Sequence, residues 1–245
     1  MFKKIVIAVI IVAVLIVASV LLWQQYGPKT EVGPKTTGLP MKVARYYWPG
    51  EYWIEIADKK GWFEEAGLNV KLVDTNPDWY GSLTDMVEGR IDVNNFSLFD
   101  LMQFVIKKND LVMVINTDMS MGSEILVARP EIQTIRDLKG KRVGVAVGSY
   151  MEYILDVVLG RSGLGSNDIT KVNVIDEKIA DKFLEENMDA AMSWDLPVVE
   201  IMIKQQGMRK LFDTSEISGI SPNGQVFHKS FIKERPEDVQ AYINV

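Results

Sequence analysis

Short runs of β-branched and apolar residues alternate with amphipathic helical segments through most of this chain, and this alternation limits its fold more than any other feature. The pattern begins with a predicted strand at 41–47 and a predicted helix at 51–60. Strands that alternate with helices at this spacing are typical of βαβ units, which build parallel sheets. The sequence therefore predicts an α/β fold.

The remaining elements fall into two sets with a similar layout. Strands are expected at 69–74, 91–96 and 111–116, then at 125–128, 141–146, 171–174 and 190–192, with helices at 79–88, 97–108, 134–138, 149–161, 179–187 and 197–206. Each set has an aspartate just before or within a strand, Asp92 and Asp189, which is expected to bond to backbone. Because ligands of such sheets bind beyond the carboxyl ends of the strands, two facing lobes with a cleft between them are predicted.

The N-terminus carries a long apolar run. Lys3 and Lys4 precede residues 5–23, where Ser19 is the single polar residue. About 19 helical residues at about 1.5 Å each can cross a hydrocarbon core of about 30 Å. We predict that residues 1–26 form a membrane anchor whose N-terminus lies inside the cell, with a cleaved signal as the alternative. Residues 27–40 are expected to be a linker, and the folded part is expected to be extracytoplasmic.

Composition excludes several classes of protein. The net charge is −6 and no Lys/Arg block occurs, so nucleic acid is not an expected partner. The chain has no cysteine and one histidine, His228, which removes disulfides, thiolate metal sites and the usual histidine-based triads. We therefore predict no metal site, no cofactor and no catalytic residue.

Four segments resemble one protein family in order and at family-like spacing. They are EIADKKGWFEEAGLNVKLVD, EGRIDVNNFSLFD, IRDLKGKRVGVAVGS and MDAAMSWDLP. They are similar to the extracytoplasmic solute-binding proteins of ABC importers, in the branch for sulfonate, nitrate, taurine and thiamine precursors. The resemblance covers about 41–245. It implies a non-enzymatic protein that captures a small solute and delivers it to an ABC permease.

The resemblance also implies a domain organisation, the two-lobe type II fold of periplasmic binding proteins. Lobe I would comprise 41–123 and 218–245, and lobe II would comprise 124–217. The hinge would lie near 120–124, with a return crossing near 219–227. Family members usually continue for several helices beyond the segment that ends here, so lobe I is expected to be a fragment or a trimmed variant.

Loops at the predicted strand ends supply the candidate ligand contacts. These residues are Tyr47, Trp48, Glu51, Ser97, Ser123, Gly148, Ser149, Tyr150, Trp194 and Asp195. The loops carry aromatic rings and carboxylates but no Lys or Arg, which a small anion would normally require. Rings and carboxylates suit a flat heterocycle or a cation. We therefore favour an aromatic heterocycle, such as a thiamine-precursor pyrimidine, over a sulfonate or nitrate.

The turn at Gly148-Ser149 has more than one interpretation. The N–H groups of a helix N-terminus can hold an anion. However, Ser149 and Glu152 match the capping box S-x-x-E, in which the two side chains satisfy these donors. A simple cap, a cap that also touches ligand and a dedicated anion site all remain open.

Two other functions are considered. One is a sensory module tethered by a single helix, although only residues 1–4 would lie in the cytoplasm. The other is an enzyme, because the family resembles the pyrimidine synthases of thiamine biosynthesis. Those enzymes carry a cysteine-rich iron-binding motif, and this chain departs from them because it has no cysteine.

Overall fold

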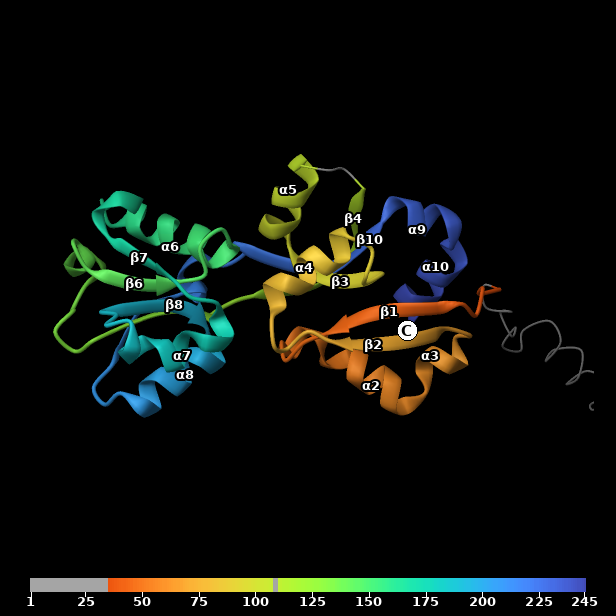
Figure 1. The fold of residues 1–245 in the computed structure, drawn as a ribbon, viewed down its shortest axis with the longest axis horizontal. Coiled ribbons are helices and arrows are strands. Elements are labelled where there is room, and N and C mark those ends of the chain that lie inside the picture. Colours follow the sequence, from red (N-terminus) through yellow and green to blue (C-terminus); the bar gives the residue numbers. More distant parts are fainter. Residues whose placement is uncertain (1–34, 108–109) are drawn as a thin grey trace, which may run out of the picture. The chain divides into compact units, whose positions relative to one another are not determined.

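In a computed structural model, the chain folds around two five-stranded sheets (Figure 1). The structure describes residues 35–107 and 110–245, and residues 36–245 form one unit. The predicted anchor at 1–26 lies outside the described residues. Among the residues that are described, no helix is both long enough and apolar enough to cross a membrane.

The first sheet has the strand order β2-β1-β3-β10-β4. Its strands are β1 (Pro40–Arg45), β2 (Asn69–Asp74), β3 (Val93–Ser97), β4 (Leu111–Ser120) and β10 (Ser221–His228). β1 pairs in parallel with β2 and β3, whereas β10 pairs antiparallel with β3 and β4.

The second sheet has the order β7-β6-β8-β5-β9. Its strands are β5 (Glu124–Ala128), β6 (Arg142–Val145), β7 (Thr170–Asn173), β8 (Ala190–Trp194) and β9 (Arg209–Asp213). β6 pairs in parallel with β7 and β8, and β5 pairs antiparallel with β8 and β9.

The predicted parallel units are present in both sheets, but each sheet also contains antiparallel strands, and the connections give the reason. The chain passes from the first sheet to the second between β4 and β5, and it returns between β9 and β10. A parallel neighbour requires a crossover connection within one sheet. β5 and β10 each enter from the other sheet, so they are free to run against their neighbours. β9 and the full length of β10 were not predicted.

Helices cover both faces of the first sheet. On one face, α2 (Tyr52–Lys60), α3 (Trp62–Glu65) and α10 (Pro236–Asn244) pack against β1, β3 and β10, with α9 (Lys229–Glu234) leading into α10. On the other face, α4 (Trp79–Val87) and α5 (Leu98–Lys107) form a second apolar cluster around Phe96 and Leu83.

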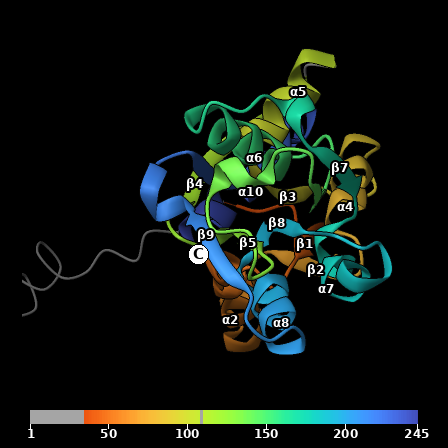
Figure 2. The ribbon, with the colours of Figure 1, turned by 90° about the vertical axis from the view of Figure 1, so that its left-hand side faces the viewer.

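The second sheet is also covered on both faces (Figure 2). α6 (Tyr150–Arg161) packs on one face, and α7 (Asp176–Glu185) and α8 (Asp195–Lys204) pack on the other. Short 3-10 turns complete the chain: η1 (Pro49–Glu51), η2 (Ile135–Leu138), η3 (Ser166–Asp168) and η4 (Thr214–Ile217).

The two sets of elements share one pattern of hydrogen bonds from an aspartate to the backbone. The carboxylate of Asp92 accepts from the Lys42 N–H at 2.7 Å, and that of Asp189 accepts from the Arg142 N–H at 2.8 Å. The N–H of each aspartate in turn donates to the carbonyl of the same partner residue. These hydrogen bonds join β1 to the residue before β3, and β6 to the residue before β8. They confirm that both aspartates bond to the backbone.

Gly224 allows β10 to lie tightly against β4. A Cβ atom there would come within 2.2 Å of the Ile115 carbonyl oxygen and 2.7 Å of the Met113 sulfur. We expect Gly224→Ala to lower the free energy of unfolding by about 1–3 kcal/mol through overpacking, measured by urea titration. The matched change is Gly160→Ala in α6, where a Cβ meets nothing within 4 Å. It should stabilise by about 0.5–1 kcal/mol. Equal stability of the two variants would contradict the packing at β10.

Candidate ligand-binding site

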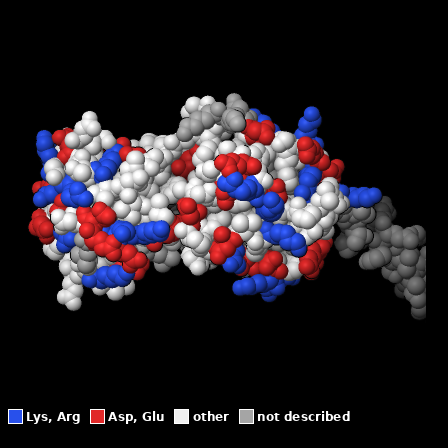
Figure 3. Space-filling view, viewed as in Figure 1, with Lys and Arg blue, Asp and Glu red and all other residues white. Residues whose placement is uncertain are grey.

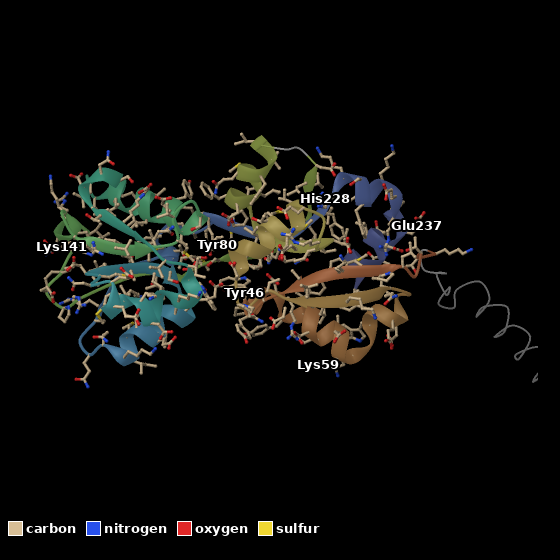
Figure 4. All side chains as sticks on the ribbon, in the orientation of Figure 1. Tyr46, Lys59, Tyr80, Lys141, His228 and Glu237 are labelled. Carbon is tan, nitrogen blue, oxygen red and sulfur yellow. The ribbon has the colours of Figure 1, made fainter. Side chains whose placement is uncertain are left out.

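A cavity lies beyond the carboxyl ends of several strands. It is lined from the first sheet by residues that follow β1 and β2, by residues within and after β3 and by one residue of β10, and from the second by residues that follow β6 and β7 and by the last residue of β8. Figure 4 shows Tyr46 and Tyr80, two of its lining residues, on the side of the first sheet that faces the second. The cavity encloses about 470 Å³ of space, part of it open to solvent.

Four aromatic rings form one wall of the cavity. The ring centroid of Tyr46 lies 4.9 Å from that of Trp79 and 5.8 Å from that of Trp194. Trp48 meets Trp194 edge-on, with centroids 6.4 Å apart. Pro49 restricts Trp48 to the extended backbone that it adopts, with φ −61° and ψ 126°. The wall combines rings from both sheets and offers apolar faces to a planar ligand.

The ring of Trp48 is held in place by polar contacts. Its indole N–H donates to Asp118 at 3.0 Å, and the amide of Asn223 donates to the same oxygen at 2.8 Å. Gly50 leaves the space for this arrangement, because a Cβ there would lie 2.3 Å from the other carboxylate oxygen of Asp118. The ring thus comes from the segment after β1, and its partners come from β4 and β10.

Three buried carboxylates line the same cavity: Glu51, Asp100 and Asp176, each at most 3% exposed. Burial raises the pKa of Glu51 to about 8, that of Asp100 to about 6 and that of Asp176 to about 7. Among the described residues, no Lys or Arg lines the cavity. On the face shown in Figure 3, by contrast, Lys and Arg are interspersed with Asp and Glu.

Two of the carboxylates have hydroxyl partners. Asp176 accepts from the Ser193 hydroxyl and, at 3.3 Å, from the Tyr80 hydroxyl. Asp100 accepts from the Ser97 hydroxyl at 2.7 Å. Tyr80 lies on α4, which packs on the first sheet, and Asp176 lies on α7, which packs on the second. This contact therefore spans the cavity.

Three buried polar atoms of the cavity lack a hydrogen-bond partner within the described part of the chain. They are Oε2 of Glu51, Oδ1 of Asn95 and the indole N–H of Trp194. Native proteins leave few buried polar groups unsatisfied, and such groups often indicate a ligand position. A solute with hydrogen-bond donors for Glu51 and Asn95 and an acceptor for Trp194 would satisfy all three.

The structure favours the capping interpretation of the Gly148-Ser149 turn. The Ser149 hydroxyl accepts from the Met151 N–H at 3.1 Å, and Glu152 accepts from the Gly148 N–H at 2.7 Å. The expected box would place Glu152 on the Ser149 N–H, but that group donates to the Ala146 carbonyl instead. Lys171 pairs with Glu152 at 2.7 Å, which anchors the cap further.

The structure brings five of the ten predicted contact residues together. The cavity is lined by Trp48, Glu51, Ser97, Tyr150 and Trp194. Tyr47 instead is 57% exposed, and Ser123 is half-buried between β4 and β5. Gly148 and Ser149 line a neighbouring cavity. Asp195 opens α8, and its side chain is outside the described part of the structure.

Several lining residues were not among the ten predicted contacts. These are Tyr46, Trp79, Tyr80, Asn95, Phe96, Asp100, Met151, Asp176 and Asn223. Trp79, Tyr80 and Asp176 lie at the beginning of the helices that follow β2 and β7. Selecting the residues after every predicted strand would therefore have found them. Asn223 lies on the incompletely predicted β10 and carries no local signal.

Residues associated with the first sheet also contact residues associated with the second sheet around the cavity. The Tyr46 hydroxyl donates to Glu177 at 2.8 Å. The Gln103 amide donates to the Gly148 carbonyl at 2.7 Å. The rings of Phe99 and Tyr153 stack with centroids 4.8 Å apart. Elements of both sheets therefore meet around the cavity.

A family model establishes which family this chain belongs to. The model described as "NMT1/THI5 like" matches residues 52–245, so the chain is a member of the NMT1/THI5-like family. The resemblance drawn from the four sequence segments is thereby confirmed.

Curated relatives are similar over parts of their length. A protein of Bacillus subtilis named for binding aliphatic sulfonates is 26% identical over 208 residues, which is 78% of this chain and 58% of the relative. A binding protein of Brucella abortus is 26% identical over 50% of this chain and 39% of its own length. A thiamine biosynthesis protein of Haemophilus influenzae is 28% identical over 53% of this chain and 41% of its length. The chain thus spans less than two thirds of each relative.

Solved structures establish the fold. The alkanesulfonate-binding protein of Xanthomonas axonopodis pv. citri, bound to MOPS, aligns with a TM-score of 0.71 and 19% identity, over 84% of this chain and 71% of its own. The periplasmic nitrate-binding protein of Synechocystis aligns with a TM-score of 0.69 and 11% identity, over 85% and 60%. The two sheets therefore form the α/β fold of periplasmic binding proteins.

The raised pKa of Glu51 predicts how stability depends on pH. Between about pH 4.5 and 8 the folded chain keeps a proton that the unfolded chain releases, so the free energy of unfolding should fall as pH rises. Asp176 and Asp100 act in the same direction. We expect Glu51→Gln to flatten this fall, measured as thermal midpoints from pH 5 to 8. Glu64→Gln, on an exposed residue of α3, is the control and should follow the wild-type profile. A steep, unchanged fall in Glu51→Gln would argue against this origin.

Proposed function

We propose that this chain captures a small aromatic solute with hydrogen-bond-donating or cationic character outside the cytoplasm and delivers it to an ABC permease. Membership of the NMT1/THI5-like family supports the class, and the relatives named as binding proteins support capture rather than catalysis. The sequence-based choice of a thiamine-precursor pyrimidine remains our specific proposal for the solute.

The observation that carries this proposal is the unpaired carboxylate oxygen of Glu51 in an aromatic cavity. A buried polar atom without a partner is costly, by about 1–3 kcal/mol. An aminopyrimidine would offer amino hydrogens to Glu51 and Asn95 and a ring nitrogen to the Trp194 N–H. Its flat ring matches the wall formed by Tyr46, Trp48 and Trp194.

The same cavity is unsuited to a sulfonate or nitrate. Glu51, Asp100 and Asp176 line it, and no described Lys or Arg does. A buried anion needs paired donors to offset its desolvation. The relatives named for sulfonates share the fold, but the lining of this cavity favours the opposite charge.

Capture would work by closure around the solute. We propose that residues 41–123 and 218–245 form lobe I, that 124–217 form lobe II, and that the hinge lies at 120–124 and 219–227. The cavity takes lining residues from both sheets, so a solute contacts both lobes in the closed form and shifts the population toward it. Residues 1–26 would tether the chain to the membrane or direct its export.

Thermal unfolding against a solute panel tests the proposal. We expect a 4-amino-2-methylpyrimidine to raise the midpoint, and taurine and nitrate to leave it unchanged. A ligand at about 100 times its Kd stabilises by about 2.7 kcal/mol. Trp194→Ala should abolish the shift because it removes a ring and the unpaired N–H. The matched control is Trp62→Ala on α3, which lies outside the cavity and should keep the response.

The opposite pattern would refute the proposed solute class. A midpoint that rises with taurine or nitrate and not with the aminopyrimidine would show that the carboxylates do not set the choice. An aminopyrimidine response that survives in Trp194→Ala would place the ligand elsewhere.

A further inference from the structure

We propose that two carboxylates outside the cavity lining, Glu124 and Glu177, determine which hydrogen bonds the cavity offers to a solute. Glu124 holds the hydroxyl proton of Tyr150, and Glu177 holds that of Tyr46, so these two lining hydroxyls can only accept hydrogen bonds from a solute. This inference rests on the proposal that the cavity is the solute site, and it adds two positioning residues that act through its lining.

The hydrogen-bonding capacity of a phenol explains this effect. A phenol hydroxyl has one proton and two lone pairs, and an ionised carboxylate only accepts. The Tyr150 hydroxyl donates to Glu124 at 3.1 Å, and the Tyr46 hydroxyl donates to Glu177 at 2.8 Å. Burial, followed by the negative charge of the partner, raises the pKa of both phenols well above the usual value. Both phenols therefore keep the single proton that they donate.

Glu124 is held as an acceptor by the residues around it. It is 0% exposed, and its Oε2 accepts from the hydroxyls of Ser120 at 2.5 Å and Thr214 at 2.6 Å. The Thr214 hydroxyl already accepts from the Gly122 N–H at 2.9 Å, so its own proton is available for Glu124. These two bonds use one carboxylate oxygen, and Oε1 is the oxygen that accepts from Tyr150.

Glu177 has the same role for a tyrosine that is associated with the other sheet. Its Oε1, which accepts from Tyr46, also accepts from the backbone N–H of Trp79 at 3.4 Å, and a backbone N–H can only donate. Tyr46 follows β1 of the first sheet, whereas Glu177 lies on α7, which packs on the second. The second sheet therefore determines what a hydroxyl of the first sheet can offer.

Other donors of the lining are used in the same way. The indole N–H of Trp48 donates to Asp118, which also does not line the cavity. The hydroxyls of Tyr80 and Ser97 donate to carboxylates as well. Within the described part of the chain, the indole N–H of Trp194 is buried in this lining without a partner. The lining therefore presents mainly acceptors, and a solute with several N–H or O–H groups suits it best.

A matched pair of neutral probes tests this inference. One is 4-amino-2-methylpyrimidine, and the other is 2,4-dimethylpyrimidine, in which a methyl group of similar size replaces the donating amino group. Calorimetric titration of the full wild-type chain should give a Kd at least about tenfold lower for the amino probe. Glu124→Ala and Glu177→Ala should each lower the Kd for the dimethyl probe by at least about threefold, because the freed hydroxyl can donate to a ring nitrogen.

Two kinds of control separate this role from loss of charge or of structure. Glu124→Gln and Glu177→Gln remove the charge but keep an acceptor oxygen for the hydroxyl, so they should retain the wild-type ratio of the two Kd values. Asp238→Ala removes a fully buried carboxylate outside the cavity, and it should lower stability without changing that ratio. A purely structural defect would weaken the binding of both probes together.

Raman spectroscopy gives a second measurement that needs no solute. The intensity ratio of the tyrosine Fermi doublet distinguishes a phenol that donates from one that accepts. The difference spectrum between the wild type and Tyr46→Phe, or Tyr150→Phe, isolates the contribution of one residue. We expect the donor signature for both tyrosines.

The outcomes separate this inference from the proposed function. No gain for the dimethyl probe in an alanine variant, or an equal gain in the matching glutamine variant, overturns the role of that carboxylate. If neither probe binds the wild type, the proposed solute is wrong. In that case, or if an alanine variant does not fold, the Raman measurement decides: a donor signature upholds the inference for that tyrosine and its carboxylate, and an acceptor signature overturns it.

Discussion

Burial of carboxylates without a cationic partner is the constraint on which this site depends. Glu51 lies in η1, Asp100 and Asp176 lie in the first turns of α5 and α7, and each is almost fully removed from water. Burial disfavours their charged forms, which is why their pKa values rise. Hydroxyl groups satisfy part of the set, and Glu51 keeps an oxygen unsatisfied. Because this oxygen is buried, a hydrogen bond that a solute donates to it is stronger here than it would be in water.

Much of the fold could be predicted from local pattern. The alternation of strands and helices predicted most elements, and β2 was predicted at its observed bounds, 69–74. The antiparallel strands could not be predicted, because direction depends on which sheet a strand enters. β10 shows this most clearly: it pairs with β3 and β4 although at least 100 residues separate it from either strand in the sequence. Its Asn223, which shares Asp118 with Trp48, was missed for the same reason.

Asp100 illustrates the limit of local reasoning within the site. The segment from Ser97 to Asp100 has the local form of a helix cap, and the two residues do bond to each other. Nothing in that segment indicates that Asp100 lines the same cavity as Tyr150, 50 positions later. Trp48, Tyr150 and Trp194 could be predicted as lining residues because their position at a strand end was itself the signal.

The central claim is that the cavity selects its solute by the sign of charge, and one matched pair of probes tests it directly. Benzamidinium and benzoate have nearly the same planar shape and opposite charge. We predict that calorimetric titration of the wild-type chain at pH 7.5 gives a Kd for benzamidinium at least about tenfold lower than that for benzoate. Tighter binding of benzoate would contradict the account.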